Sequence, residues 1–339
     1  MGVYKSFAVT VPGGSHIKNN IPCQDASCKY DGKYGGGFLS FAAAADGHGD
    51  ANCFRSEKGA RLAADCAAKG IAKFVKFHEA KLYPGPFKKK NIPSPDDFDK
   101  AVRDLVRHII ASWQEEVQKD FTAYPFTEEE LEGADEKHRK RFELPEKRSK
   151  AYGTTLIAAA ITDDYWFGIH IGDGRLTALY ADGSFQQPVP WDERCYLNVT
   201  TSICDDEAAE QARHYFSFIN KDIPAPVAVF LCTDGVDDNY PVDGNEKHLF
   251  KLYRTIALTF AKDGFASTEN QLKDLSHAFA TKGKGDDTSI AGVIDLKAAG
   301  KAAAVWEEQV ANEELAMSNE KEDGPDEYGS FVKGDGDEQ

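Results

Sequence analysis

The chain has 339 residues, which suffices for one large domain or two ordinary ones, and its 41% hydrophobic content can bury a substantial core. It carries 56 acidic against 40 basic side chains, a net charge of −16. This surplus excludes nucleic acid and anionic membranes as main partners, because both require clustered Lys and Arg. No apolar run reaches the roughly 18 residues that span a bilayer. The composition therefore predicts a globular protein without stable membrane insertion.

The seven cysteines form no CxxC pair and no regular framework, which is typical of reduced intracellular thiols. The N-terminus lacks a secretory signal, so we expect a cytoplasmic protein. Met1 to Ser6 fits the loose pattern for N-myristoylation at Gly2. The neighbouring residues Ser6 to Val11 also fit an edge strand, and a single acyl chain would anchor the protein only weakly.

Short segments that are rich in β-branched or aromatic residues and closed by Gly, Asp or Pro predict strands. They cover about residues 4–11, 38–45, 154–161, 165–171, 175–180, 226–232 and 288–295. A further strand-like stretch follows Asp25. Apolar residues at helical spacing predict helices at about 51–78, 97–120, 246–263 and 268–281.

The three strands between residues 154 and 180 are joined by two tight turns, which predicts a meander of antiparallel hairpins. A parallel, doubly wound sheet does not fit this pattern. The helices occur in pairs after the first strands and before the last. We therefore expect an α+β fold, a four-layer α/β/β/α sandwich of two antiparallel sheets flanked by helix pairs. The Pro-rich, charged stretches at about 79–96 and 121–150 are interpreted as surface excursions.

The composition changes at about residue 298, which predicts one main domain over 1–297 and an acidic extension over 298–339. Residues 301–339 contain twelve Asp or Glu against three Lys. Ala302 to Met317 can form a helix, whereas Ser318 to Gln339 is predicted to be disordered. Solubility and weak interactions are the simpler role for such a tail, and regulation is the alternative.

The run of apolar residues 38–45 leads into the sequence Asp46-Gly47-His48-Gly49-Asp50. The glycines remove side chains, so that backbone carbonyls and a hard cation can approach closely, while Asp46 supplies an oxygen ligand. Ordinary turn chemistry explains this motif equally well when it is taken alone.

Acidic residues recur at strand ends elsewhere in the chain. Asp234 follows a buried strand, Asp286 precedes another, Asp173 lies between two strands, and Asp25 precedes a strand-like stretch. If the central strands align, these carboxylates gather with Asp46 at one rim, and divalent cations must neutralise them. Oxygen ligands suit Mg²⁺ or Mn²⁺, whereas the His and Cys spacing of a zinc site is not found.

This ordered set resembles the metal-dependent Ser/Thr protein phosphatases of type 2C, the PPM-type family. The resemblance covers about residues 4–296 and places the phosphatase domain at 1–297. Its matching points are Gln24-Asp25-Ala26, Asp46-Gly47-His48-Gly49, Gly153-Thr154-Thr155, Gly172-Asp173-Gly174-Arg175, Thr233-Asp234-Gly235 and Gly285-Asp286-Asp287-Thr288. The fold of the family, two antiparallel sheets flanked by helices, agrees with the layers expected above.

The resemblance implies a centre of two metals with a weaker third. Asp46 would bridge the two metals, and the carbonyl of Gly47 would complete one of them. Asp234 and Asp286 would bind the other metal, and Asp25 would hold waters of the site. The residue matching Asp173 helps hold the third metal together with the one matching Asp234.

The resemblance also implies an activity: hydrolysis of phosphoserine and phosphothreonine in protein substrates by direct attack of a metal-bridging hydroxide. His48 matches the proposed general acid of the family. We expect a monomer. Residues 181–225 lie where the family carries a flap over its site, a place where specificity could reside.

Three departures from the family pattern bear on this interpretation. Asn20 stands where an Arg usually grips the substrate phosphate, Gln24 stands where Glu is frequent, and Asp287 stands where Asn is common. Possible substitutes for the Arg are His16, Lys18 and Arg55.

Two alternatives remain at the sequence level. The missing Arg is compatible with a pseudophosphatase that binds phosphorylated or protein partners without turnover. The same site could also hydrolyse a small phosphorylated metabolite. The intact carboxylates and His48 favour the protein phosphatase.

Overall fold

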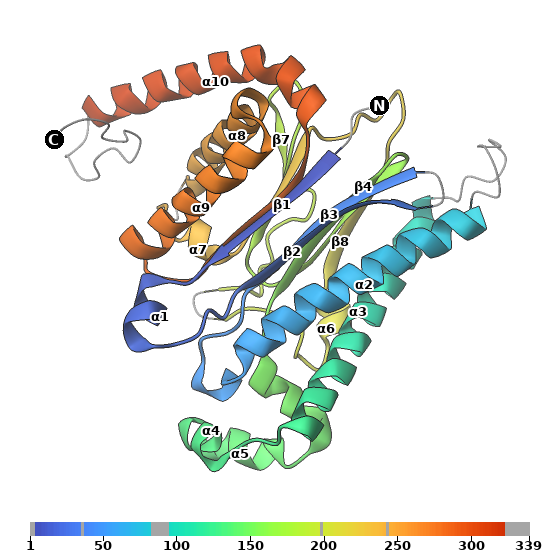
Figure 1. Cartoon of the computed structure of the whole chain (residues 1–339), viewed down its shortest axis with the longest axis vertical. Helices are drawn as coiled ribbons and strands as arrows, with labels where there is room; N and C mark the ends of the chain where they lie inside the picture. The colour runs from blue at the N-terminus through green and yellow to red at the C-terminus, as the bar shows by residue number, and fades with distance from the viewer. Residues whose placement is uncertain (1–3, 35–36, 83–94, 197–198, 242–243, 323–339) are drawn as a thin grey trace.

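The computed structural model describes residues 4–34, 37–82, 95–196, 199–241 and 244–322, and its strands form two five-stranded antiparallel sheets (Figure 1). Sheet A has the order β1 (Tyr4–Val11), β10 (Thr288–Asp295), β9 (Ala228–Cys232), β6 (Arg175–Leu179) and β7 (Phe185–Gln186). Sheet B has the order β2 (Ala26–Tyr34), β3 (Gly37–Ala45), β4 (Leu156–Thr162), β5 (Tyr165–Ile171) and β8 (Arg213–Phe218).

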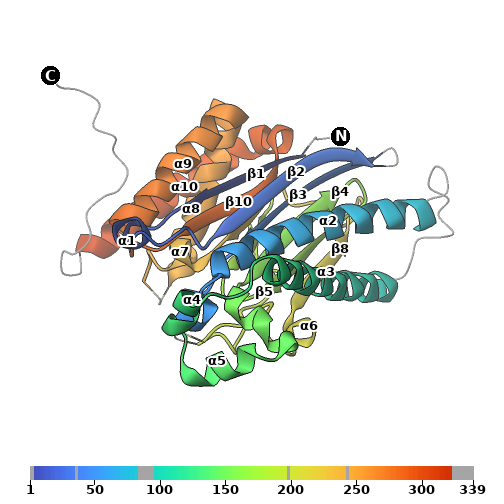
Figure 2. The ribbon, with the colours of Figure 1, turned by 60° about the horizontal axis from the view of Figure 1, so that its bottom comes forward.

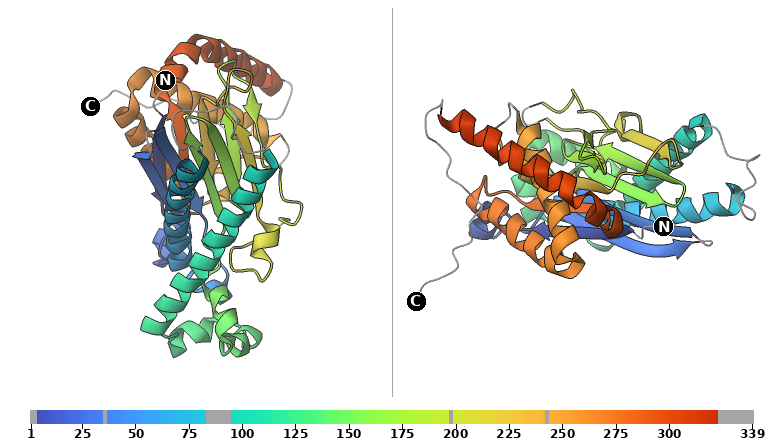
Figure 3. Two further views of the ribbon diagram at one scale, coloured as in Figure 1. Left: turned by 90° about the vertical axis from the view of Figure 1, so that its right-hand side faces the viewer. Right: turned by 90° about the horizontal axis from the view of Figure 1, so that it is seen from above.

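Long helices cover the outer face of each sheet (Figure 2). On sheet B, α2 (Ser56–Leu82) packs against β2 and β3, and α3 (Pro95–Ala123) packs against α2 and β8. On sheet A, α9 (Phe265–Lys282) packs against β1 and β10, α8 (Asn245–Asp263) against α9, and α10 (Leu296–Glu322) against α8. The two sheets face each other between these helices (Figure 3). The predicted four-layer α+β sandwich is confirmed.

The core has three parts, one between each pair of layers. The part between the two sheets contains small side chains such as Ala42, Ala44 and Ala159 of sheet B, opposite Val229 and Leu231 of sheet A. The other two parts lie between sheet B and α2 and α3, and between sheet A and its helices. Because β3, β4, β9 and β10 are covered on both faces, they are continuous apolar runs rather than alternating ones.

Several short elements join these layers, and most of them were not expected from the sequence. They are α1 (Gly14–Asn19), the 3₁₀ helix η1 (Ala51–Cys53), α4 (Glu128–Gly133), α5 (Glu136–Phe142), the 3₁₀ helix η3 (Pro145–Tyr152), α6 (Ala208–Gln211) and α7 (Asp234–Asp237). A capping box of Thr127 and Glu130 starts α4, and the Asp135 side chain caps α5. β7 and β8 lie inside residues 181–225, where no strand was predicted.

The last helix is longer than expected. α10 starts at Leu296 and continues to Glu322, past the predicted helix of Ala302 to Met317 and past Ser318. Its residues Ala299, Ala302 and Trp306 belong to the core over sheet A. The domain boundary at residue 297 stays a prediction, and residues 323–339 of the acidic tail lie outside the described part of the chain.

All seven cysteines are free thiols, as expected. Gly2, the site of the expected myristoylation, lies outside the described residues. Among the described helices, none combines the length and the apolar character needed to cross a membrane.

Candidate metal centre

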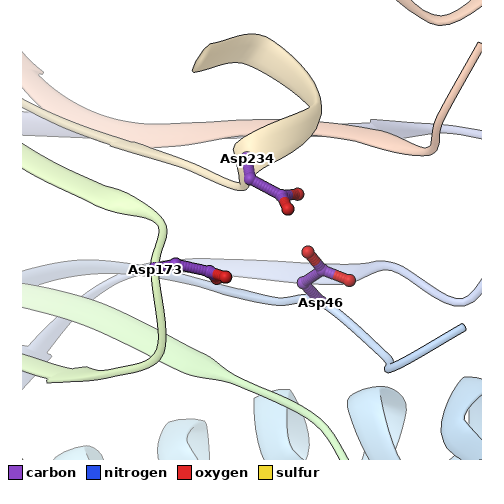
Figure 4. A group of neighbouring side chains, drawn as sticks. All are labelled: Asp46, Asp173 and Asp234. Carbon is purple, nitrogen blue, oxygen red and sulfur yellow. The ribbon is translucent and has the colours of Figure 1, made fainter. Parts of the chain in front are cut away.

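Three aspartates meet at one rim of the sandwich, and each comes from the end of a strand. Asp46 follows β3, Asp173 lies in the turn between β5 and β6, and Asp234 begins α7 directly after β9. One carboxylate oxygen of each lies within 4.8 Å of those of the other two. Figure 4 shows the three side chains pointing toward one another. The sequence therefore predicted this meeting correctly for three of its five carboxylates.

Strand pairing explains why Asp173 and Asp234 lie close together. β6 runs antiparallel to β9, with Arg175 opposite Cys232. The residues just before β6 and just after β9 therefore meet at the same end of sheet A.

Thr155 connects this end of sheet A to Asp46. The Thr155 N–H donates to the carbonyl of Asp46 at 2.8 Å, and the Asp46 N–H donates to Thr155 Oγ1 at 3.0 Å. On the other side, a Cβ at Gly172 would lie 2.5 Å from Cγ2 of Thr155, and the φ of Gly172 is +116°. Only glycine fits this position, so the Asp173 turn rests directly on the residue that holds Asp46.

None of the three carboxylates takes part in an ion pair within the described chain, and the charge of Arg213 only lowers the raised pKa of Asp173. Burial raises the pKa of Asp46 well above its usual range, and the charges of Asp234, Asp25 and Asp173 raise it further. Burial, with the charges of Asp173 and Asp286, raises the pKa of Asp234 to about 7. A half-buried, all-oxygen cluster with surplus negative charge fits a hard divalent cation.

Asp25 and Asp286 lie beside this group and are not part of it. Asp25 is buried, and the Thr233 hydroxyl donates to its Oδ2 at 2.9 Å. The negative charge of Asp25 raises the pKa of Asp46, as does that of Asp234. The Asp286 side chain is 56% exposed, and its Oδ1 accepts the N–H of Asp287 at 2.8 Å.

Gly47 has no room for a side chain. A Cβ there would lie 2.6 Å from the carbonyl oxygen of Gln24 and 2.8 Å from that of Ser56. Its N–H donates to the Gln24 carbonyl at 3.1 Å. The motif therefore needs this glycine for close backbone packing next to Asp46.

His48 lies beside Gly153. Its N–H donates to the Gly153 carbonyl at 3.1 Å, and its Cδ2 would lie 2.7 Å from a Cβ at Gly153. Burial, together with the charge of Lys150, lowers the pKa of His48 to about 4, and the charge of Asp50 acts in the opposite sense. The imidazole is therefore neutral near pH 7 in the structure without substrate.

The three suggested substitutes for the missing Arg have different environments. Arg55 is buried and donates to Glu130 at 2.7 and 2.8 Å and to the Tyr152 hydroxyl at 2.8 Å, so it is not available to a substrate. His16 Nδ1 lies 2.9 Å from Oδ2 of Asp287.

Lys18 and Asn20 are exposed, and Asn20 ends α1 with a φ of 54°. The close approach of the His16 ring to the Asp287 carboxylate gives a physical reason why position 287 is an Asp in this chain.

The structure also shows residues next to the site that sequence reasoning missed, chiefly Asp192, Thr201 and Arg213. Thr201 and Arg213 form hydrogen bonds with Gly172 in the turn that carries Asp173, and Asp192 contacts both of them. No local motif marks them, since their partners lie far away in the sequence.

The fold and its acidic rim correspond to a known family. The sequence model of the family described as Protein phosphatase 2C matches residues 12–275, well over half of the chain. The chain therefore belongs to the Protein phosphatase 2C family of metal-dependent serine/threonine phosphatases, as the motifs predicted. No curated protein matches the sequence.

Solved structures with a similar fold include bacterial phosphatases. The serine/threonine phosphatase PstP/Ppp of Mycobacterium tuberculosis is 15% identical, with 86% of this chain and 98% of that chain covered and a TM-score of 0.47. For Stp1 of Staphylococcus aureus the identity is 13%, the coverage 87% and 95%, and the TM-score 0.47. The catalytic domain of PstP with two manganese ions has 16% identity, coverage of 87% and 99%, and a TM-score of 0.45. Likeness at these identities concerns the fold alone.

Proposed function

We propose that this chain hydrolyses phosphoserine and phosphothreonine in phosphorylated proteins with Mg²⁺ or Mn²⁺ bound at the rim of Asp46, Asp173 and Asp234. The observation that carries the proposal is the meeting of these carboxylate oxygens within 4.8 Å, without an ion-pair partner in the described chain, in a member of this phosphatase family. The surplus of negative charge on half-buried oxygen ligands gives the rim a preference for divalent cations.

Each site residue has a role in this proposal. Asp46 would be shared between two ions, and Gly47 would offer its carbonyl. Asp234 and Asp286 would hold the second ion, and Asp173 with Asp234 would offer a weaker third position. The buried Asp25 would hold waters of the site. Bound divalent cations supply an activated water and neutralise the charge of the phosphoryl oxygens.

His48 is proposed as the general acid that protonates the departing serine or threonine oxygen. An alkoxide is a poor leaving group, and proton transfer of this kind contributes roughly 10²–10⁴-fold to a rate. Burial and Lys150 keep the pKa of His48 at about 4 before substrate binds. A phosphate dianion beside the imidazole would raise that pKa, so the substrate itself favours the protonated form that the role requires.

The test is phosphate release from a phosphothreonine peptide with Mn²⁺, followed by EDTA. We expect release that EDTA abolishes, and we expect Asp46→Asn and Asp234→Asn to abolish turnover, because each removes a charged ligand and residues that only support a metal ligand already contribute about 10- to 100-fold. Asp104→Asn, which changes an exposed carboxylate of α3, is the control and should leave turnover unchanged. Tight binding of the peptide without release would favour the pseudophosphatase, and activity on small phosphate esters alone would favour a metabolite phosphatase.

A further inference from the structure

The turn that carries Asp173 is held by residues of a segment far along the chain. Both polar backbone groups of Gly172 are bound by this segment. The Gly172 N–H donates to Thr201 Oγ1 at 3.0 Å, and Arg213 Nη2 donates to the Gly172 carbonyl at 3.0 Å. The hydroxyl of Thr200 faces the Asp173 carboxylate and lowers its pKa, against the larger effect of burial. We call Asp192, Thr200, Thr201 and Arg213 the clasp.

Asp192 joins the members of the clasp to one another. It is buried, and its Oδ2 accepts the Thr201 hydroxyl at 3.2 Å and lies 3.4 Å from Nε of Arg213. Arg194 also donates to it, at 2.8 and 2.9 Å, from a side chain that is 46% exposed. Despite burial, these partners hold the pKa of Asp192 below its usual range, so it is ionised at neutral pH.

The clasp sets where the Asp173 carboxylate lies relative to Asp46. Thr201 and Arg213 fix the backbone of the turn from one side, and Thr155 meets Gly172 from the other. Thr155 in turn binds both backbone groups of Asp46. The turn between β5 and β6 has three residues. It is therefore held between Thr155 on one side and the clasp on the other.

We propose that the clasp is a positioning device for the proposed metal ligand Asp173, so that its four residues contribute to metal affinity without touching the metal. The inference rests on the proposed function, in which Asp173 and Asp234 share the weakest ion. Residues that hold a metal ligand in place typically contribute 10- to 100-fold to metal affinity.

The choice of variant matters because Arg213 has two opposite effects. Its hydrogen bond positions the turn, but its charge stabilises the ionised form of Asp173 and would repel a cation. Thr201→Val is the cleaner change, since it removes the acceptor of Gly172 N–H and the donor to Asp192 without altering any charge. Thr200→Val is a second variant, which removes the hydroxyl that lowers the pKa of Asp173.

The experiment is a calorimetric titration of the metal-free full-length protein with Mn²⁺. We expect Thr201→Val and Thr200→Val to lower the Mn²⁺ affinity of the weakest class of sites by about tenfold or more. Thr201→Ser, which keeps the hydroxyl, should retain the wild-type affinity. Arg194→Gln is the matched control, because Arg194 binds the same carboxylate of Asp192 but makes no bond to Gly172. We expect its Mn²⁺ affinity to stay within about twofold of the wild type.

Two outcomes would overturn the inference: unchanged Mn²⁺ affinity in both Val variants that fold, or equal weakening by Arg194→Gln. Thermal unfolding of each metal-free variant identifies any that fails to fold, and Thr200→Val keeps the test decisive if Thr201→Val is lost. Failure of the proposed function has a different signature. In that case the wild type itself binds no Mn²⁺, or Asp46→Asn binds it as well as the wild type.

Discussion

The protonation of Asp46 and Asp234 links metal binding to the stability of the metal-free protein. Burial and neighbouring carboxylates raise the pKa of Asp234 from 3.8 to about 7. The folded chain therefore keeps a proton that the unfolded chain releases above about pH 4. Since the unfolded state binds fewer protons between these values, the free energy of unfolding falls as the pH rises through this range.

We expect metal-free protein to lose stability between about pH 4 and 7, by about 4 kcal/mol for Asp234 alone. Urea unfolding in EDTA across this range measures the loss. Asp234→Asn should flatten the profile, and Mn²⁺ should restore stability at pH 8. A wild-type profile that stays level from pH 4 to 7 would contradict the assigned charge repulsion.

The leaving group separates the role of His48 from that of the metals. His48→Ala should slow hydrolysis of a phosphothreonine peptide by roughly 10²–10⁴-fold, because the departing alkoxide needs a proton. An aryl phosphate, whose leaving group is stable as an anion, should be affected far less. Steady-state rates with both substrates test this, and equal losses would refute the role as acid.

At the residue scale, the sequence revealed the rim carboxylates better than the residues that support them. Asp46, Asp173 and Asp234 each stand beside a glycine at the end of an apolar strand, so local pattern alone identified them. The bond between Thr201 and Gly172 could not be found in this way, because it joins residues brought together only by the packing of β5, β8 and the segment between them. His16 was singled out, but its partner Asp287 became evident only from the fold.

At the scale of elements, Arg55 fastens the excursion around α4 to the start of α2. Its guanidinium donates to Glu130 in α4 and to the carbonyl of Tyr124, and it lies 4.7 Å from the ring centre of Phe126. The Tyr152 hydroxyl accepts a further bond at 2.8 Å. One buried cation therefore joins α2, α4 and η3.

Arg55→Ala should lower the free energy of unfolding by about 3 kcal/mol, because it leaves buried acceptors without their donor. Arg61→Ala is the control on the same helix: its pair with Glu57 is exposed, and we expect a change within about 0.5 kcal/mol. Guanidinium unfolding measures both values. Similar losses for the two variants would show that the contacts of Arg55 add nothing beyond those of a surface arginine.

Elements with a strong local pattern were predictable, and those defined by tertiary contacts were not. The hairpins from β4 to β6 follow from tight turns between apolar runs. β8 was not predicted because it lacks an apolar alternation. It lies at the edge of sheet B, all its side chains are half-buried, and Arg213, His214 and Ser217 stand among its aromatic residues. Its strand character comes from pairing with β5.

At the scale of the whole molecule, α10 closes the outer face of the sheet A side. Trp306 is fully buried, and its indole N–H donates to the carbonyl of Tyr180 at 3.3 Å. Ala299 and Ala302 continue the same face of the helix. The acidic composition of this region led to its prediction as an extension of the domain. The few buried side chains of α10 give no clear apolar pattern within such a charged segment.

Trp306→Ala should lower the free energy of unfolding by about 3–5 kcal/mol, the usual cost of removing a buried aromatic side chain. Val305→Ala, at an adjacent position that is 45% exposed, should cost less than about 1 kcal/mol. Denaturant unfolding compares them. A small loss for Trp306→Ala would mean that α10 is dispensable for the sandwich.

The rim carboxylates belong to two different sheets, and this bears on the mechanics of the fold. Asp46 extends from sheet B, Asp234 extends from sheet A, and Asp173 lies in the chain that crosses between them. Repulsion among the three carboxylates therefore pushes the sheets apart at this end, where no strand pairing joins the two sheets among the described residues. A divalent cation at the rim would reverse the sign of that force and act as a reversible crosslink of the sandwich.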